Sequence, residues 1–146
     1  MNSKNPPAEL SYFRLSLTDF LRESHPQVLS DEKFIVARSE AAMEAYEQAI
    51  RNGTNPIEAE EQANAVLFSG LHFSKYDTLV NILWNEFSVE VPENKAKEFA
   101  LKLLPKCEAV FAQYFLSDNF AYEPEYELLY TELTGEIAFY IERHGV

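Results

Sequence analysis

Residues 58–87 read EAEEQANAVLFSGLHFSKYDTLVNILWNEF and contain two amphipathic helical patterns with a short break between them. The break covers residues 70–73, where Gly70 interrupts the apolar spacing of three and four residues that is typical of a helix. The two patterns therefore predict two helices joined by a tight connection. This segment indicates the architecture of the chain, and its break contains His72, one of three histidines.

Helical spacing of apolar residues recurs along the rest of the chain, and no segment alternates apolar and polar residues between hairpin turns as a strand does. We therefore predict an all-α fold with about seven helices. A length of 146 residues is typical of one domain that buries about 70 per cent of its unfolded surface. We expect a single compact helical domain over residues 1–146, with residues 1–7 as a flexible N-terminus.

Capping residues predict where the helices begin. Ser30 is expected to cap a helix that runs to about Arg51, because a serine side chain accepts hydrogen bonds from the first unpaired amides of a helix. Asn55 is expected to cap the next helix, and Ser74 the one after the break. The helix that follows Ser74 is apolar on more than one side, which is typical of a central core helix.

Two further expectations concern individual helices. The helix up to Arg51 is predicted to turn one set of side chains inward: Phe34, Ala37, Ala41, Ala45, Tyr46, Ala49 and Ile50. Pro105 is expected to end or kink the helix before it, because proline has no amide hydrogen and its ring clashes with the preceding turn. Residues 105–116 are therefore assigned to a separate helix.

The chain carries a formal charge of −12, from 24 acidic and 12 basic residues. Non-specific binding to nucleic acids or to an anionic membrane needs clustered Lys and Arg, so the charge argues against both. The imbalance is greatest near the C-terminus, where residues 108–146 contain eight acidic residues and one basic residue, Arg143.

Cysteine content and hydropathy indicate a cytoplasmic protein. The single cysteine, Cys107, cannot form a disulfide within the chain. Residues 1–10 lack the apolar stretch of a signal peptide, and no apolar run reaches the roughly 18 residues that span a bilayer. We expect neither secretion nor insertion into a membrane.

No metal or cofactor site is predicted from the sequence. His25, His72 and His144 lie far apart, and none has a glutamate at the spacing of three that aligns two ligands on a helix. The four glycines are scattered, so the sequence contains no glycine-rich loop of the kind that binds phosphate.

His72, Tyr76 and Asp77 form the one local group of titratable residues among apolar ones. A hydrogen bond donated by the imidazole of His72 to the carboxylate of Asp77 would set the tautomer that a general base needs, so these three are the candidate catalytic residues. In the structural alternative, Asp77 caps a helix, Tyr76 packs in the core and His72 bonds to a backbone carbonyl. No nucleophile is identifiable, which favours the structural alternative.

Cys107 lies near Lys102 and Lys106 in the sequence. Lysines that approach a thiol in space lower its pKa and make it reactive. No sequence signature of a nucleophilic cysteine surrounds Cys107, so an ordinary helix cysteine is the preferred interpretation.

The segment 119–142, NFAYEPEYELLYTELTGEIAFYIE, is both aromatic and acidic. In one interpretation its tyrosines fill the core while Glu125, Glu132 and Glu136 form a solvated face. In the other, the acidic face docks a basic partner or imitates the phosphates of DNA.

Four stretches resemble a known family: LSYFRLSLTDFLRESHP, NPIEAEEQANAVLFSGLHFSKYDTL, ILWNEF and AYEPEYELLYTELTGEI. The resemblance is to an uncharacterised Bacteroidetes family of small all-helical proteins, a domain of unknown function. It implies one helical domain and assigns no catalytic or binding residue. The association of the family with genomes rich in conjugative transposons implies an accessory role on mobile elements.

By elimination, the sequence favours a small helical module that binds an unknown protein partner; a homo-oligomer is compatible with it as well. Two alternatives remain. One is an acidic DNA mimic that inhibits restriction-type enzymes, and the other is an enzyme centred on His72, Tyr76 and Asp77.

Overall fold

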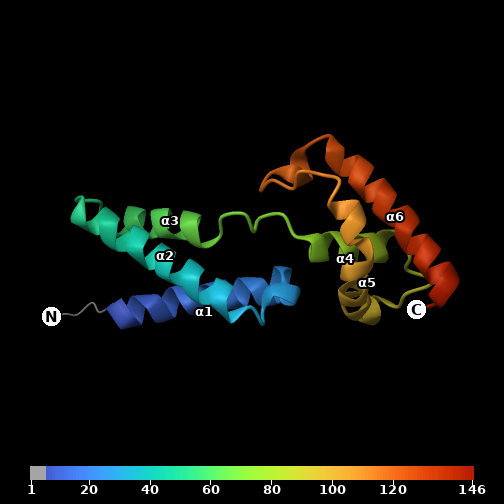
Figure 1. Ribbon diagram of the computed structural model, residues 1–146, viewed down its shortest axis with the longest axis horizontal. Helices are drawn as coiled ribbons and strands as arrows, with labels where there is room; N and C mark the ends of the chain where they lie inside the picture. Colours follow the sequence, from blue (N-terminus) through green and yellow to red (C-terminus); the bar gives the residue numbers. More distant parts are fainter. Residues whose placement is uncertain (1–5) are drawn as a thin grey trace. The chain divides into compact units, whose positions relative to one another are not determined.

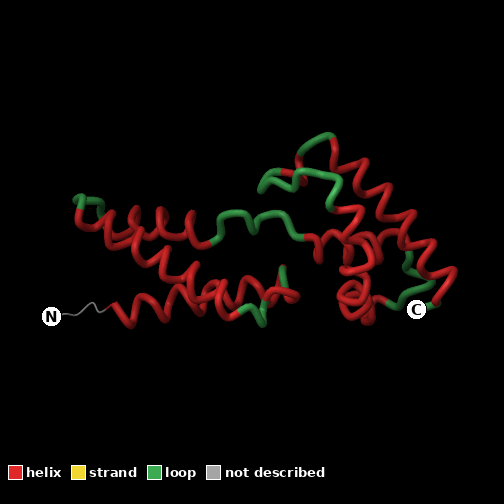
Figure 2. The backbone as a smooth tube through the Cα atoms, viewed as in Figure 1, coloured by secondary structure: helices red, strands yellow, loops and turns green. Residues whose placement is uncertain are grey.

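The computed structural model describes residues 6–146, and in that range it contains six α-helices, three short 3₁₀ helices and no strand (Figures 1 and 2). The predicted all-α class is confirmed, and the predicted number of about seven helices is close. Of the expected flexible N-terminus, residues 1–5 lie outside the described residues. Pro6 and Pro7 belong to the first helix, α1 (Pro6–Ser24).

The chain divides between Ser69 and Gly70 into two compact helical units. The first contains α1, η1 (Pro26–Val28), α2 (Glu32–Arg51) and α3 (Pro56–Leu67). The second contains α4 (Lys75–Glu86), η2 (Glu93–Lys95), α5 (Ala96–Phe111), η3 (Phe120–Tyr122) and α6 (Glu125–His144). The expectation of a single domain over residues 1–146 stays a prediction.

In the first unit, α2 packs against both α1 and α3. Alanines on the facing sides of α2 and α3 allow the two backbones to approach closely. The buried apolar side chains of this unit are Phe13, Leu17, Leu21, Ile35, Ala42, Ala49, Ala59, Ala63 and Leu67.

Two predicted caps are confirmed. The side chain of Asn55 accepts the backbone N–H of Glu58 at 2.9 Å at the start of α3, and Pro56 takes the first helical position. The Oγ of Ser74 accepts the N–H of Asp77 at 2.8 Å at the start of α4. Both caps depend on residues three apart, so local sequence is sufficient to specify them.

The start and the buried face of α2 differ from the prediction. Asp31, not Ser30, caps the helix by accepting the N–H of Phe34 at 3.1 Å. The expected inward residues Ala37, Ala41 and Ile50 are exposed, and the buried face of α2 consists of Ile35, Ser39, Ala42 and Ala49. Alanine is small and weakly apolar, so an alanine-rich helix does not define its buried face by hydrophobicity alone.

Arg38 stabilises the end of α3 from the middle of α2. Its guanidinium donates to the carbonyl of Leu67 at 3.0 Å and to that of Ser69 at 2.7 Å. The last carbonyls of a helix have no partner within the helix and carry the negative end of its dipole, so a cation is favourable there. These hydrogen bonds from Arg38 thus fix the position of residues 67–69, which directly precede the predicted break at 70–73.

In the second unit, α4 contacts both α5 and α6. Six of its twelve residues are buried, on more than one side of the helix, so the predicted core helix is central to this unit. The core around it includes Phe99, Leu103, Phe111, Phe120, Leu129, Leu133 and Ile137.

Pro105 lies inside α5, so the prediction of a separate helix over residues 105–116 is wrong. The helix continues because its buried stripe crosses the proline, from Leu103 and Leu104 to Cys107 and Phe111. Both Pro105 and Leu101, whose carbonyl loses its amide partner, are exposed, so water can solvate that carbonyl. Burial of the stripe offsets the local cost of the proline.

Replacing Pro105 with alanine tests this account. Pro105→Ala restores an amide donor to the carbonyl of Leu101 and removes the ring clash, a gain of up to about 3 kcal/mol. The alanine also makes the unfolded chain more flexible than the proline does, and the entropy lost on folding reduces this gain by about 1 kcal/mol. We expect the free energy of unfolding to rise by about 1–2 kcal/mol in urea denaturation followed by circular dichroism. A decrease in the free energy of unfolding by a similar amount would instead show that the proline stabilises the helix at this position.

Candidate functional site

The predicted break at residues 70–73 is a loop clamped by one carboxylate, that of Asp118. One oxygen of Asp118 accepts the backbone N–H of Gly70 at 3.0 Å, and the other accepts the N–H of His72 at 3.1 Å. The first oxygen also lies 3.2 Å from Nδ1 of His72. Gly70 has a φ of +78°, a left-handed conformation that glycine adopts without strain and that aims its N–H at the carboxylate.

The clamp favours the ionised form of Asp118. The N–H of Gly70 makes the largest contribution to lowering the pKa of the Asp118 carboxyl. Partial burial opposes this shift, and the N–H and imidazole of His72 add to it. The side chains of His72 and Asp118 are 58% and 36% exposed, so water reaches both. A carboxylate at Nδ1 orients the imidazole with Nε2 free to accept a proton, the arrangement of a general base.

The other two candidate catalytic residues lie on α4. Tyr76 is buried in the core of the second unit, and Asp77 lies in the first turn, where its backbone N–H bonds to Ser74. The sequence gives no local signal for Asp118, because it is 46 residues from His72 and lies in a turn between two other helices. The hypothesis that His72, Tyr76 and Asp77 form a catalytic group stays a prediction.

Aromatic rings hold the two loops of the clamp together. Phe73 packs edge-on against Phe120 with ring centroids 5.3 Å apart. Phe120 also contacts Tyr114 at 5.9 Å and Tyr126 at 6.3 Å. Because Phe73 follows His72 and Phe120 lies two residues after Asp118, this packing places the carboxylate against the loop. Apolar contact and charged hydrogen bonds therefore act on the same two segments.

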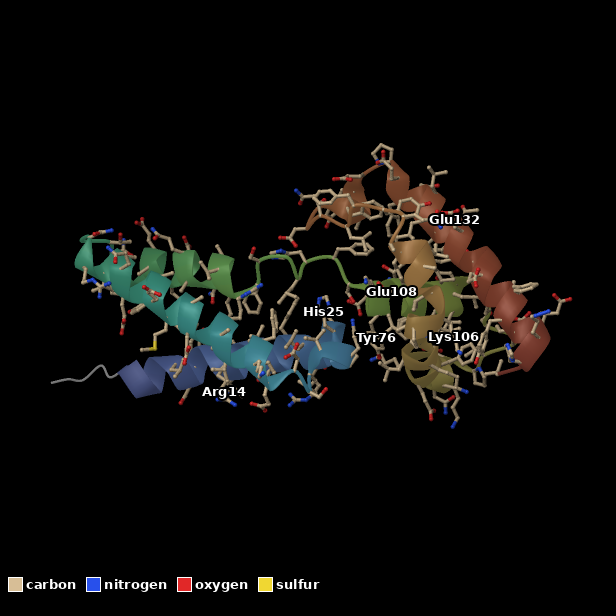
Figure 3. All side chains as sticks on the ribbon, viewed as in Figure 1. Arg14, His25, Tyr76, Lys106, Glu108 and Glu132 are labelled. Carbon is tan, nitrogen blue, oxygen red and sulfur yellow. The ribbon has the colours of Figure 1, made fainter. Side chains whose placement is uncertain are left out.

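Two polar pairs lie around this aromatic cluster, and Figure 3 labels one member of each, Glu108 of α5 and Glu132 of α6. Lys75 of α4 contacts Glu108 at 3.0 Å and lies over the ring of Phe111. The hydroxyl of Tyr114 donates to Glu132, and this bond raises the pKa of Tyr114 to about 12. A phenol with such a pKa stays protonated at neutral pH, so it acts as a donor and not as a base.

Cys107 is fully buried in α5. Burial raises the pKa of its thiol to about 12, and the negative charge of Glu136 adds to the shift. Both effects oppose activation by Lys102 and Lys106 and favour the interpretation as an ordinary helix cysteine, which stays a prediction.

Within residues 6–146, no group of three His, Cys, Asp or Glu side chains converges so that it could hold a metal ion. Over the same residues, no helix is long and apolar enough to cross a bilayer.

The model of one protein family, described as a domain of unknown function (DUF1896), matches residues 5–146. The chain belongs to the DUF1896 family. The resemblance predicted from the sequence to a domain of unknown function is thereby confirmed. No curated protein matches the chain.

A solved structure supports the fold of this DUF1896 member. It is the crystal structure of protein PG0816 from Porphyromonas gingivalis, which is 45% identical and has a TM-score of 0.93. The similarity covers 98% of this chain and 97% of that one. Porphyromonas belongs to the Bacteroidetes, the group to which the sequence resemblance pointed.

Removal of the clamping carboxylate is expected to destabilise the second unit. Asp118→Ala leaves the N–H groups of Gly70 and His72 without their acceptor, which should cost about 1 kcal/mol after solvent screening. Asn119→Ala, in the same loop, is the matched control, because Asn119 pairs through its backbone carbonyl with Tyr122. Urea denaturation should separate the two variants, and equal stability would contradict the clamp.

The effect should depend on pH in a defined direction. Because the pKa of Asp118 is lowered on folding, its contribution is fully present above the unfolded carboxyl pKa of about 4. That contribution is lost as the pH falls through the lower folded pKa. The stability difference between the native chain and Asp118→Ala should therefore be present above about pH 4 and shrink below it.

The thiol of Cys107 should be unreactive in the folded protein. A buried thiol with a pKa of about 12 carries almost no thiolate at pH 8, so iodoacetamide should modify it only when α5 opens. Modification followed by mass spectrometry should be at least about a hundredfold faster in 6 M guanidinium than in buffer. Comparable rates in the two conditions would show that the thiol is accessible.

Proposed function

We propose that this chain is a cytoplasmic protein-interaction module that binds a basic partner protein through residues 115–128. The observation that carries the proposal is the exposure of three large apolar side chains in this short segment. Phe115 is 84% exposed, Tyr122 is 89% exposed and Leu128 is 61% exposed. Aromatic side chains are enriched at the centres of protein interfaces, because they bury much area at little cost in conformational entropy.

The same segment is held in a defined conformation. Phe120 is buried in the core, and the Oγ of Ser117 donates to a carboxylate oxygen of Glu123 at 3.1 Å. The N–H of Tyr122 bonds to the carbonyl of Asn119 at 2.9 Å. A surface that is ordered before binding loses less conformational entropy on association, so these bonds support a binding role.

Charge favours a basic partner. Glu123, Glu125 and Glu127 lie between or beside the exposed apolar residues, and residues 108–142 contain no Lys or Arg. Such a surface attracts a partner that carries basic side chains around an apolar centre and repels an acidic one. It also predicts that association weakens as salt is added.

A general-base role for His72 is the second candidate. It is favoured by the 3.2 Å contact between Asp118 and Nδ1, which orients the imidazole. We rank it second because the pair is open to water, whereas catalytic pairs gain strength from exclusion of water.

Binding through residues 115–128 can be tested with paired variants of the whole chain. Phe115→Ser/Tyr122→Ser removes two exposed aromatic rings, and Leu101→Ser removes an exposed apolar side chain on α5, outside the segment 115–128. The native chain and the two variants are immobilised and used to capture partners from a host lysate at low and high salt. We expect basic proteins to be retained by the native chain and by Leu101→Ser, and to be lost from the double variant.

The captured partner then distinguishes docking from DNA mimicry. The partner should bind the double variant at least about tenfold more weakly than the native chain, since aromatic side chains at an interface contribute about 2 kcal/mol each. Duplex DNA that competes for the same partner would favour the DNA mimic. Retention that is unchanged in the double variant, or retention of acidic proteins alone, would contradict the proposed surface.

A further inference from the structure

Two pockets adjoin at Trp84, the one tryptophan of the chain. One pocket has a volume of about 370 Å³ and the other a volume of about 520 Å³. Trp84 and Glu93 line both, so the two pockets form one groove at the end of α4. The Trp84 groove is lined by Trp84, Ser88, Val91, Glu93, Asn94 and Lys97.

The walls of the groove are formed in advance. The indole N–H of Trp84 points to the carbonyl of Glu93 at 3.4 Å, and the side chain remains 40% exposed. Phe87 and Val91 are buried, and the N–H of Val91 donates to the carbonyl of Phe87 at 2.8 Å. The turn between α4 and η2 is thereby fixed beside the indole.

Charges around the groove favour a cation in the smaller pocket. Of the three acids in residues 84–94, Glu93 lines both pockets, whereas Glu86 accepts a hydrogen bond from Tyr130 and Glu90 lines neither pocket. Glu93 is the charged residue that lines the smaller pocket, whereas Lys97 also lines the larger one. An aromatic face beside a carboxylate attracts a guanidinium by cation–π and ionic interaction.

We propose that the Trp84 groove binds an arginine side chain of a peptide segment of another protein. The guanidinium lies on the indole in the smaller pocket and pairs with Glu93. Asn94 and Lys97 in the larger pocket bond to backbone carbonyls of the same segment. Val89, which is 92% exposed in the adjacent turn, contacts an apolar neighbour of the arginine. A peptide fits this open groove better than a small molecule, because small-molecule sites enclose most of the ligand surface.

This site is independent of the proposed function, since it shares no residue with the segment 115–128. The emission of Trp84 reports directly on the groove, because the chain has no other tryptophan. The probe is the capped peptide acetyl-Leu-Arg-Leu-amide, titrated into the whole chain at low salt. The control is the same peptide with citrulline in place of arginine, because citrulline keeps the shape of the side chain and removes its charge.

We expect a saturable change in Trp84 emission with the arginine peptide and about fivefold weaker binding of the citrulline peptide. Glu93→Gln should weaken the arginine peptide about fivefold while leaving the citrulline peptide unchanged. Glu127→Gln, an exposed glutamate in the segment 115–128, and the Phe115→Ser/Tyr122→Ser variant should bind like the native chain. Circular dichroism confirms that each variant is folded.

Three results would overturn the proposal: no saturable emission change, equal affinity for the two peptides, or unchanged arginine binding in Glu93→Gln. Loss of binding in the Phe115→Ser/Tyr122→Ser variant alone would also overturn it, because the cation would then bind at the other surface. Failure of partner capture through residues 115–128 leaves these titrations unaffected, so the two proposals fail separately.

Discussion

Phe120 lies almost wholly buried between three segments of the second unit: the loop at Phe73, the turn after α5 at Tyr114 and the start of α6 at Tyr126. Burying a phenylalanine side chain is worth about 2–3 kcal/mol, and here it also fixes the path of the chain between two helices. With Phe120 inside, Asp118 is held where its carboxylate meets the amides of the 70–73 loop. Tyr122, two residues later, is left outside in solvent. One buried ring therefore accounts for both the loop clamp and the exposed aromatic surface.

Sequence alone predicted the features that depend on residues close together in the chain. The caps at Asn55 and Ser74 and the central helix α4 are of this kind, because their signals lie within one or two turns. The prediction of the buried face of α2 was wrong because alanines on several sides leave no distinct apolar stripe. The prediction that a separate helix begins at Pro105 was wrong because the cost of a proline is local, whereas the burial that offsets it comes from the neighbouring helices. Asp118 was missed because only the folded chain brings it to His72.

Basic and acidic residues are separated along the sequence of the second unit. Four lysines lie at the start of α5 or within it: Lys95, Lys97, Lys102 and Lys106. The sequence after Glu108 is acidic and contains one basic residue, Arg143. The Trp84 groove lies by the first turn of α5, and Phe115 follows its last turn. Because a helix of 16 residues is about 24 Å long, a single cationic side chain cannot occupy both surfaces. A partner that uses both must be an extended or folded polypeptide.

The left-handed backbone at Gly70 has a consequence for how this family varies. A β-carbon at this position would meet nothing within 4 Å, so space does not exclude larger residues. The φ of +78° does exclude most of them, because L-residues other than asparagine and aspartate rarely adopt it. Evolutionary drift at this site should therefore be confined to glycine, asparagine and aspartate. The position would tolerate a polar side chain that points into solvent, and it would reject alanine, the smallest substitution available.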